Sequence, residues 1–145
     1  MALKTYDLSK VIVTLNGLPI GGAGDGDKIS IERASDDWTL TVGADGETTR
    51  SKQNNASGTI TLTLQYGADA NSVLSALQKL DETTGFGTFA IIVNDTLGLS
   101  LCSSTDAFIM RQPSLTYGRD VGQVEWQIMC GHLSITPGLQ IPTAL

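Results

Sequence analysis

The stretch of sequence that decides the fold reads Thr59-Ile60-Thr61-Leu62-Thr63-Leu64-Gln65-Tyr66. Polar and apolar side chains alternate along it, and successive residues of a β-strand point to opposite faces of a sheet. The strand therefore presents a row of threonines on one face and a row of large apolar side chains on the other. A strand of this kind covers a hydrophobic core with one face and contacts water with the other.

The same period of two recurs on both sides of this stretch. Alternating segments cover residues 9–15, 28–33, 38–42 and 124–130. Within residues 38–42, Trp38, Leu40 and Val42 alternate with threonines and predict a further half-buried strand. Residues 89–93 form a continuous apolar run, which is typical of a strand covered on both faces. Shorter strands are expected at 97–103 and 107–111.

One segment has the period of a helix instead. Its apolar positions are Val73, Leu74, Leu77 and Leu80. They lie on one side of an α-helix, for which Asp69 or Asn71 is the expected N-cap and Gly85 the expected stop. The sequence thus predicts a mainly β fold, a β-sandwich or barrel of about eight strands with one packed α-helix.

The chain has 145 residues, which suits a single domain spanning 1–145. Residues 43–56 hold four charged side chains and no large apolar one, and they are expected to form an extended loop. A polar stretch of this length inside a compact domain is usually functional or mobile. Residues 137–145 are expected to form a C-terminal tail that docks on a neighbour.

Composition points to self-assembly. Charged residues make up only 17% of the chain, against about 25% in typical domains, so part of the surface is expected to be covered by other subunits. The formal net charge of −6 argues against a nucleic-acid-binding protein, because phosphate binding requires clustered Lys and Arg. Neither a secretory leader nor a membrane-spanning run is recognisable, so a cytosolic origin without membrane insertion is expected.

The sequence offers little catalytic chemistry. His132 is the only histidine, and it lies near the end of a predicted strand. Cys102 and Cys130 fall in apolar runs and are interpreted as buried, reduced thiols. A metal site made of Cys102, Cys130 and His132 would lack a fourth ligand. We therefore expect no catalytic residue, metal or cofactor.

Several segments together resemble the tail tube proteins of contractile-tailed phages and related prophages. The matching segments are 42–47, 50–52, 55, 57–64, the helix from Asn71 to Asp81, the turn at 85–87, the opening at 9–11 and 16–17, and the closing pair Glu125-Trp126. The resemblance covers about residues 6 to 135. Its strength lies in the order and spacing of many weak matches.

This resemblance implies an assembly. Tube proteins of this kind form hexameric rings in which each subunit contributes strands to a continuous inner β-barrel, with the helix outside. The rings stack through an extended loop and the termini into a hollow conduit for DNA, which passes through without specific binding. The implied partners are the tail sheath and the tape-measure, baseplate and terminator proteins. The implied location is the virion tail, assembled in the bacterial host cytoplasm.

Two sets of residues follow as candidates for this role. Asp45, Glu47, Arg50 and Lys52 offer both signs of charge for contacts between subunits and rings, where charged pairs set register more than affinity. Glu32 lies on a polar strand face and is the candidate for a side chain that faces the lumen.

Three other readings remain open from the sequence. The same module serves in tailocins and contractile secretion systems. A small-molecule-binding β-barrel or an enzyme would need an apolar pocket with convergent polar groups. An adhesion sandwich would be expected to carry a leader and disulfides.

Overall fold

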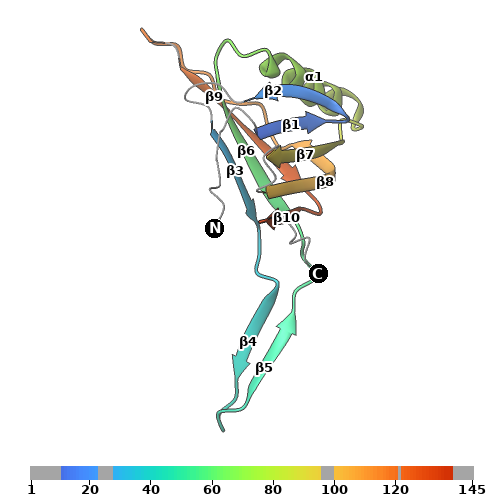
Figure 1. Cartoon of the computed structure of the whole chain (residues 1–145), viewed down its shortest axis with the longest axis vertical. Coiled ribbons are helices and arrows are strands. Elements are labelled where there is room, and N and C mark those ends of the chain that lie inside the picture. Colours follow the sequence, from blue (N-terminus) through green and yellow to red (C-terminus); the bar gives the residue numbers. More distant parts are fainter. Residues whose placement is uncertain (1–10, 23–27, 96–99, 121, 139–145) are drawn as a thin grey trace, which may run out of the picture.

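The computed structural model describes residues 11–22, 28–95, 100–120 and 122–138. These residues form a mainly β structure with one helix, as the sequence predicts (Figure 1). The elements are β1 (Val11–Leu15), β2 (Leu18–Gly22), β3 (Lys28–Arg33), β4 (Trp38–Val42), β5 (Thr48–Lys52), β6 (Gly58–Gln65), α1 (Ala70–Thr84), β7 (Phe89–Asp95), β8 (Ser100–Ile109), β9 (Gln123–Cys130) and β10 (Ser134–Pro137).

Eight of the strands belong to one antiparallel sheet in the order β2-β1-β7-β8-β9-β6-β3, with β10 beside β8. β9 and β10 pair with successive parts of β8, and both run antiparallel to it. Cys130 of β9 is opposite Ala107, and Ser134 of β10 is opposite Ser103, so the register does not shift between the two strands. In Figure 1, β3, β6 and β9 run along the long axis of the molecule, while β1, β7 and β8 cross it. The sheet is strongly bent, but it is not a closed barrel within one subunit.

The apolar row of β6 lies in the core, as its alternation predicts. Ile60 and Leu62 are fully buried, and Ile128 of the neighbouring strand β9 is buried beside Ile60. Leu74 of α1 is also fully buried. Burying such a side chain stabilises the fold by about 1.5–3 kcal/mol relative to leaving it exposed. Packing of α1 against the sheet therefore supplies much of the stability of the helix.

The two ends of α1 differ in how they are capped. Asp69 occupies the N-cap position without a side-chain hydrogen bond to the helix. Gly85 ends the helix in a left-handed conformation with φ of 75°, and its N–H donates to the Asp81 carbonyl at 2.8 Å. The predicted stop is confirmed. Asn71, the alternative N-cap, instead bridges the helix to the sheet, as described below.

The prediction of a half-buried strand at 38–42 was wrong. All five residues of β4 are exposed, with 44% of Trp38, 69% of Leu40 and 62% of Val42 accessible. β4 pairs only with β5, and the two form a separate hairpin away from the sheet (Figure 1). The expected extended loop at 43–56 thus contains a strand. Sequence alternation reports which face is apolar, but it does not reveal whether that face meets the subunit's own core.

Two further expectations were also incorrect. The run at 89–93 is not covered on both faces, because Ile92 of β7 is 42% exposed. The predicted strands at 97–103 and 107–111 are joined in the single strand β8. The polar residues at 104–106 stay in the strand because Asp106 accepts hydrogen bonds from the Ser104 hydroxyl at 3.0 Å and the His132 N–H at 3.1 Å. Most of the expected tail, residues 139–145, lies outside the described residues.

Candidate assembly surfaces

The hairpin Trp38–Lys52, called the arm below, is the most prominent feature outside the core. Figure 1 shows it projecting from the end of the molecule opposite α1. Leu40 is opposite Arg50 and Trp38 is opposite Lys52 across the two strands. Directly opposed residues share a face of the pair. One face of the arm therefore combines exposed apolar side chains with two basic ones.

Arg50 is attached to this face by an aromatic contact. Its guanidinium carbon lies 4.0 Å from the ring centroid of Trp38. A cation in this position is attracted to the negative face of the ring, an interaction worth about 0.5–1 kcal/mol at exposed sites. The contact joins the two strands diagonally, because Trp38 is opposite Lys52 and Arg50 is opposite Leu40.

The tip of the arm, residues 43–47, is acidic and internally hydrogen-bonded. The Gly43 N–H donates to the Glu47 carbonyl at 2.7 Å, and the Gly46 N–H donates to the Gly43 carbonyl at 3.0 Å. An Asp45 carboxylate oxygen accepts from the Glu47 N–H at 3.2 Å. Gly46 has φ of 87°, a conformation that glycine adopts without strain. The turn thus presents the Asp45 and Glu47 side chains at the far end of the arm.

The root of the arm is anchored to the sheet. The Gln53 N–H donates to the Asp37 carbonyl at 2.7 Å, which closes the hairpin at its base. Arg33 donates from Nη1 to Asp37 Oδ1 at 2.9 Å and from Nε to the Leu133 carbonyl at 2.8 Å. Because Arg33 ends β3 and Leu133 is buried beside β10, these bonds fix the direction in which the arm leaves the body.

The structure separates the four charged residues that the sequence put forward as contact candidates. Asp45 and Glu47 lie together at the tip, whereas Arg50 and Lys52 lie on the apolar face nearer the root. Sequence reasoning missed Trp38 and Leu40 as surface residues. One signal could have revealed them, because the residues opposite them, 48–52, contain no apolar side chain with which to build a core.

A second candidate surface is the polar face of β3, β6 and β9. Three cross-strand rows form it: Glu32–Thr59–Met129, Ser30–Thr61–Gln127 and Lys28–Thr63–Glu125. Glu32 is exposed at the edge of this face, beside Thr59. The Thr59 hydroxyl contacts the Met129 sulfur at 3.3 Å. Hydroxyl and amide groups occupy the middle of the face, while the charged side chains of Lys28, Glu32 and Glu125 lie in its two outer rows.

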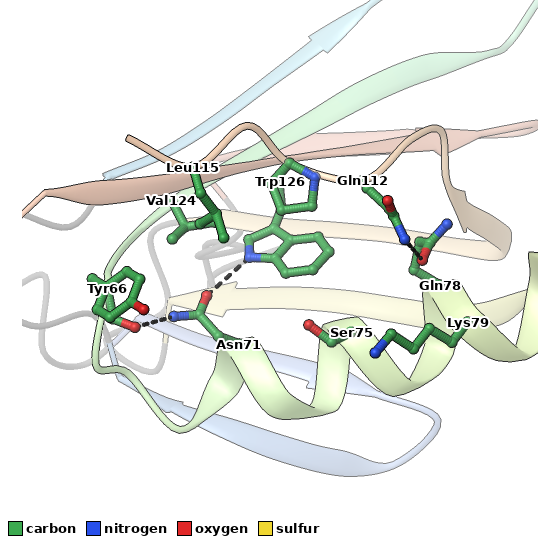
Figure 2. Close-up of a pocket in the computed structure, with 10 residues that line it drawn as sticks. Tyr66, Asn71, Ser75, Gln78, Lys79, Gln112, Leu115, Val124 and Trp126 are labelled. Carbon is green, nitrogen blue, oxygen red and sulfur yellow. Dashed lines mark hydrogen bonds between the residues drawn. The ribbon is translucent and has the colours of Figure 1, made fainter. Parts of the chain in front are cut away.

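A groove beside α1 is the third surface (Figure 2). It has a volume of about 410 Å³ and lies between α1, β9 and the segment 112–115. The Trp126 indole N–H donates to Asn71 Oδ1 at 2.9 Å at its floor. Asn71 Nδ2 donates in turn to the carbonyls of Gln65 and Tyr66 at 3.0 and 3.1 Å. This network closes one end of the groove and joins α1 to β6 and β9.

Lys79 is the one charged side chain that lines this groove. Apolar groups from Leu115, Val124 and Trp126 supply much of the remaining lining, and no carboxylate does. In the described ranges, the only ion pair is that between Arg33 and Asp37. Sequence reasoning did not single out Lys79, because a lone lysine on a helix is normally only a solvated residue.

Among the described residues, no three His, Cys, Asp or Glu side chains are grouped to hold a metal ion. Cys102 and Cys130 are both buried and unpaired, and burial raises the pKa of each thiol above its usual value. No helix in the described part of the chain has the length and apolar character needed to cross a membrane.

Comparison with known protein families identifies the chain. Residues 4–138 match the family described as Bacteriophage PhiTE tail tube protein, and the chain belongs to this family. It is also 28% identical over 133 residues to "Structural protein ORF10" of Pseudomonas phage KPP10, a match that covers 86% of this chain and 77% of the relative. The resemblance noted in the sequence is confirmed.

Solved structures share the fold at low sequence identity. The cap that terminates the tube of the anti-feeding prophage is 14% identical with a TM-score of 0.59, covering 94% of this chain and 95% of that chain. A chain of the sheath-tube complex of the PVC extracellular contractile injection system is 15% identical with a TM-score of 0.56, covering 92% of each chain. A chain of a native gene transfer agent virion is 14% identical with a TM-score of 0.56, covering 91% of this chain and 99% of that chain.

Proposed function

We propose that the subunits close into hexameric rings, and that the rings stack into a hollow conduit for DNA delivery. The observation that carries the stacking role is the arm. It exposes Trp38, Leu40 and Val42 on one face while belonging to neither the sheet nor the core. Exposed apolar side chains gathered on a projecting hairpin favour a contact with another subunit. Asp45, Glu47, Arg50 and Lys52 then set the register of that contact.

The polar face of β3, β6 and β9 is the proposed lining of the lumen, with Glu32 among its side chains. Hydroxyl and amide groups keep such a surface wet while the opposite face of the same strands covers the core. Each subunit carries a formal charge of −6. Acidic groups on the lumen wall repel phosphates within a Debye length of about 8 Å at physiological salt. DNA therefore slides through without binding.

The proposed partners are further copies of this chain, a surrounding sheath, and terminator, tape-measure and baseplate proteins. Support for a sheath and a terminator comes from structures of similar fold, which include a sheath-tube complex and a sheath/tube terminator of a contractile injection system. Assembly takes place in the host cytoplasm, and the product is the virion tail. The proposed role requires no catalysis, cofactor or membrane insertion.

A contractile injection system without DNA is the second candidate, and the same structural neighbours favour it. The two candidate functions differ in whether the assembled particle contains DNA. A phage tube protein is recovered in particles that contain a DNA-filled head, whereas a tailocin or secretion tube is recovered without one. Purification of particles that carry this chain, followed by a nuclease-protection assay, separates the two.

The stacking role is tested by removing the arm. Because the Gln53 N–H donates directly to the Asp37 carbonyl, an Asn-Gly turn can replace residues 38–52. The shortened chain should keep its core and melt as a folded protein, but electron microscopy should show no tubes under conditions in which the complete chain forms them. Normal tubes from the shortened chain would refute the role assigned to the arm.

A further inference from the structure

We propose that the acidic tip of the arm docks in the groove beside α1 of a copy in the next ring, where Glu47 pairs with Lys79. This inference rests on the proposed stacking function and adds the acceptor site to it. The contact joins the tip of one copy to the groove of another, so the two partners use different surfaces.

The tip of the arm and the groove carry opposite charges. The tip presents Asp45 and Glu47 without an ion pair in the described part of the structure. The groove presents Lys79, with no acidic side chain in its lining. Opposite charges on the two surfaces favour this pairing over an unrelated one, and they fix its register. The Glu47 side chain also takes no part in the hydrogen bonds that hold the turn, so it is free to form the pair.

The tip and the groove also match in size and polarity. Val42 and Ala44 add small, exposed apolar groups to the end of the arm. The groove offers Leu115 at its mouth, which is 51% exposed, and the buried ring of Trp126 at its floor. A space of about 410 Å³ accommodates a few side chains of a turn but not a second helix. Apolar contact supplies affinity, while the ion pair supplies orientation.

The tip and the groove lie at opposite ends of the subunit. The arm extends from one end of the long axis, and α1 lies near the other end (Figure 1). A contact between two different patches is heterologous, and it forms an open stack when the copies follow one another along an axis without closing into a ring. Patches at opposite ends of the subunit favour such a stack. Contacts of the tip with another tip would instead be symmetric and would end in a dimer. An open-ended stack needs the first arrangement.

Charge reversal tests the pair directly. Glu47→Lys and Lys79→Glu should each raise the protein concentration needed for tube formation by at least about tenfold, because each places like charges in contact. The double variant should restore assembly to near the level of the natural chain. Tube formation is measured by sedimentation and negative-stain electron microscopy, and thermal melting of free subunits checks that each variant folds.

A matched control separates the contact from net charge. Asp36 is exposed at the root of the arm, away from the tip. Asp36→Lys combined with Lys79→Glu restores the same net charge as the double variant, but it should not restore assembly. Three results would overturn the pair while tube formation itself still stands. They are rescue of Lys79→Glu by Asp36→Lys, normal assembly of both single variants, and no rescue of Lys79→Glu by Glu47→Lys. Free subunits in every sample, the natural chain included, would overturn the stacking function together with the contact.

Discussion

Arg50 and Trp38 form a cation–π pair across the arm, with the guanidinium carbon 4.0 Å from the ring centroid. The pair places a basic group and a large aromatic ring together on a surface that the subunit's own core does not use. Trp and Arg are the residue types most enriched among side chains that dominate binding energy at protein interfaces. We therefore expect the body of the arm, as well as its tip, to contribute to the proposed contact with another subunit.

Trp38→Ala is expected to weaken assembly without unfolding the subunit. The substitution removes the aromatic ring and the contact of Arg50, but β4 makes no contribution to the core. We expect the melting temperature to change by no more than about 4 °C, because the lost cation–π contact is worth about 0.5–1 kcal/mol and the ring lies outside the core. The concentration needed for tubes should rise markedly. Thr41→Ala, on the other face of β4, is the matched control. Equal behaviour of the two variants in sedimentation would contradict the proposed contact face.

Asn71→Ala is expected to destabilise the subunit itself. Asn71 accepts from the Trp126 indole and donates to the carbonyls of Gln65 and Tyr66. Its removal leaves the largely buried indole N–H without this partner, at a cost of about 1–3 kcal/mol. Chemical denaturation measures the loss. Ser72→Ala, at the next, exposed position of α1, is the control and should change stability little. A loss below the uncertainty of the measurement would show that water replaces the amide.

Glu32→Cys tests the proposed lumen. Both natural cysteines are buried, so an introduced thiol reports its own surroundings. In free subunits it should react with a maleimide carrying a long polyethylene glycol chain. In tubes the same reagent should be excluded, while a small maleimide still reacts. Ala76→Cys, on an exposed position of α1, should react with both reagents in both states. Equal labelling of the two positions in tubes would place Glu32 outside the lumen.

The buried thiols are expected to lower the stability of the subunit at alkaline pH. Burial raises the pKa of Cys102 and of Cys130 in the folded state, whereas an unfolded thiol ionises near pH 8.5. The folded state therefore holds these protons more tightly. Its advantage is complete below about pH 8.5 and is lost as the pH rises through the folded pKa. Melting temperatures between pH 7 and pH 10 should fall more steeply for the natural chain than for a Cys102→Ala, Cys130→Ala variant. Parallel slopes would contradict the effect.

The core and the helix could be predicted from the sequence because one physical rule governs them. The alternation of Ile60 and Leu62 with threonines places them against the core, and the spacing of Val73 and Leu74 places α1 on the sheet. Hydrophobic burial acts on these residues within the subunit, so the pattern and the structure agree.

The arm could not be predicted in the same way. Trp38 and Leu40 follow the same alternation, yet both are exposed on a hairpin that lies apart from the main sheet. Lys79 gave no sign in the sequence, because the groove that it lines is formed by segments far apart in the chain. Periodicity indicates which side chains share an apolar face, whereas only the tertiary structure shows whether the subunit itself buries that face.

Electron microscopy of the purified chain at high concentration is the decisive experiment for tube formation. The predicted result is hollow tubes of stacked six-subunit rings, with the polar face of β3, β6 and β9 around the channel and the arm bridging successive rings. Compact monomers at every concentration, or filaments without a central channel, would contradict it.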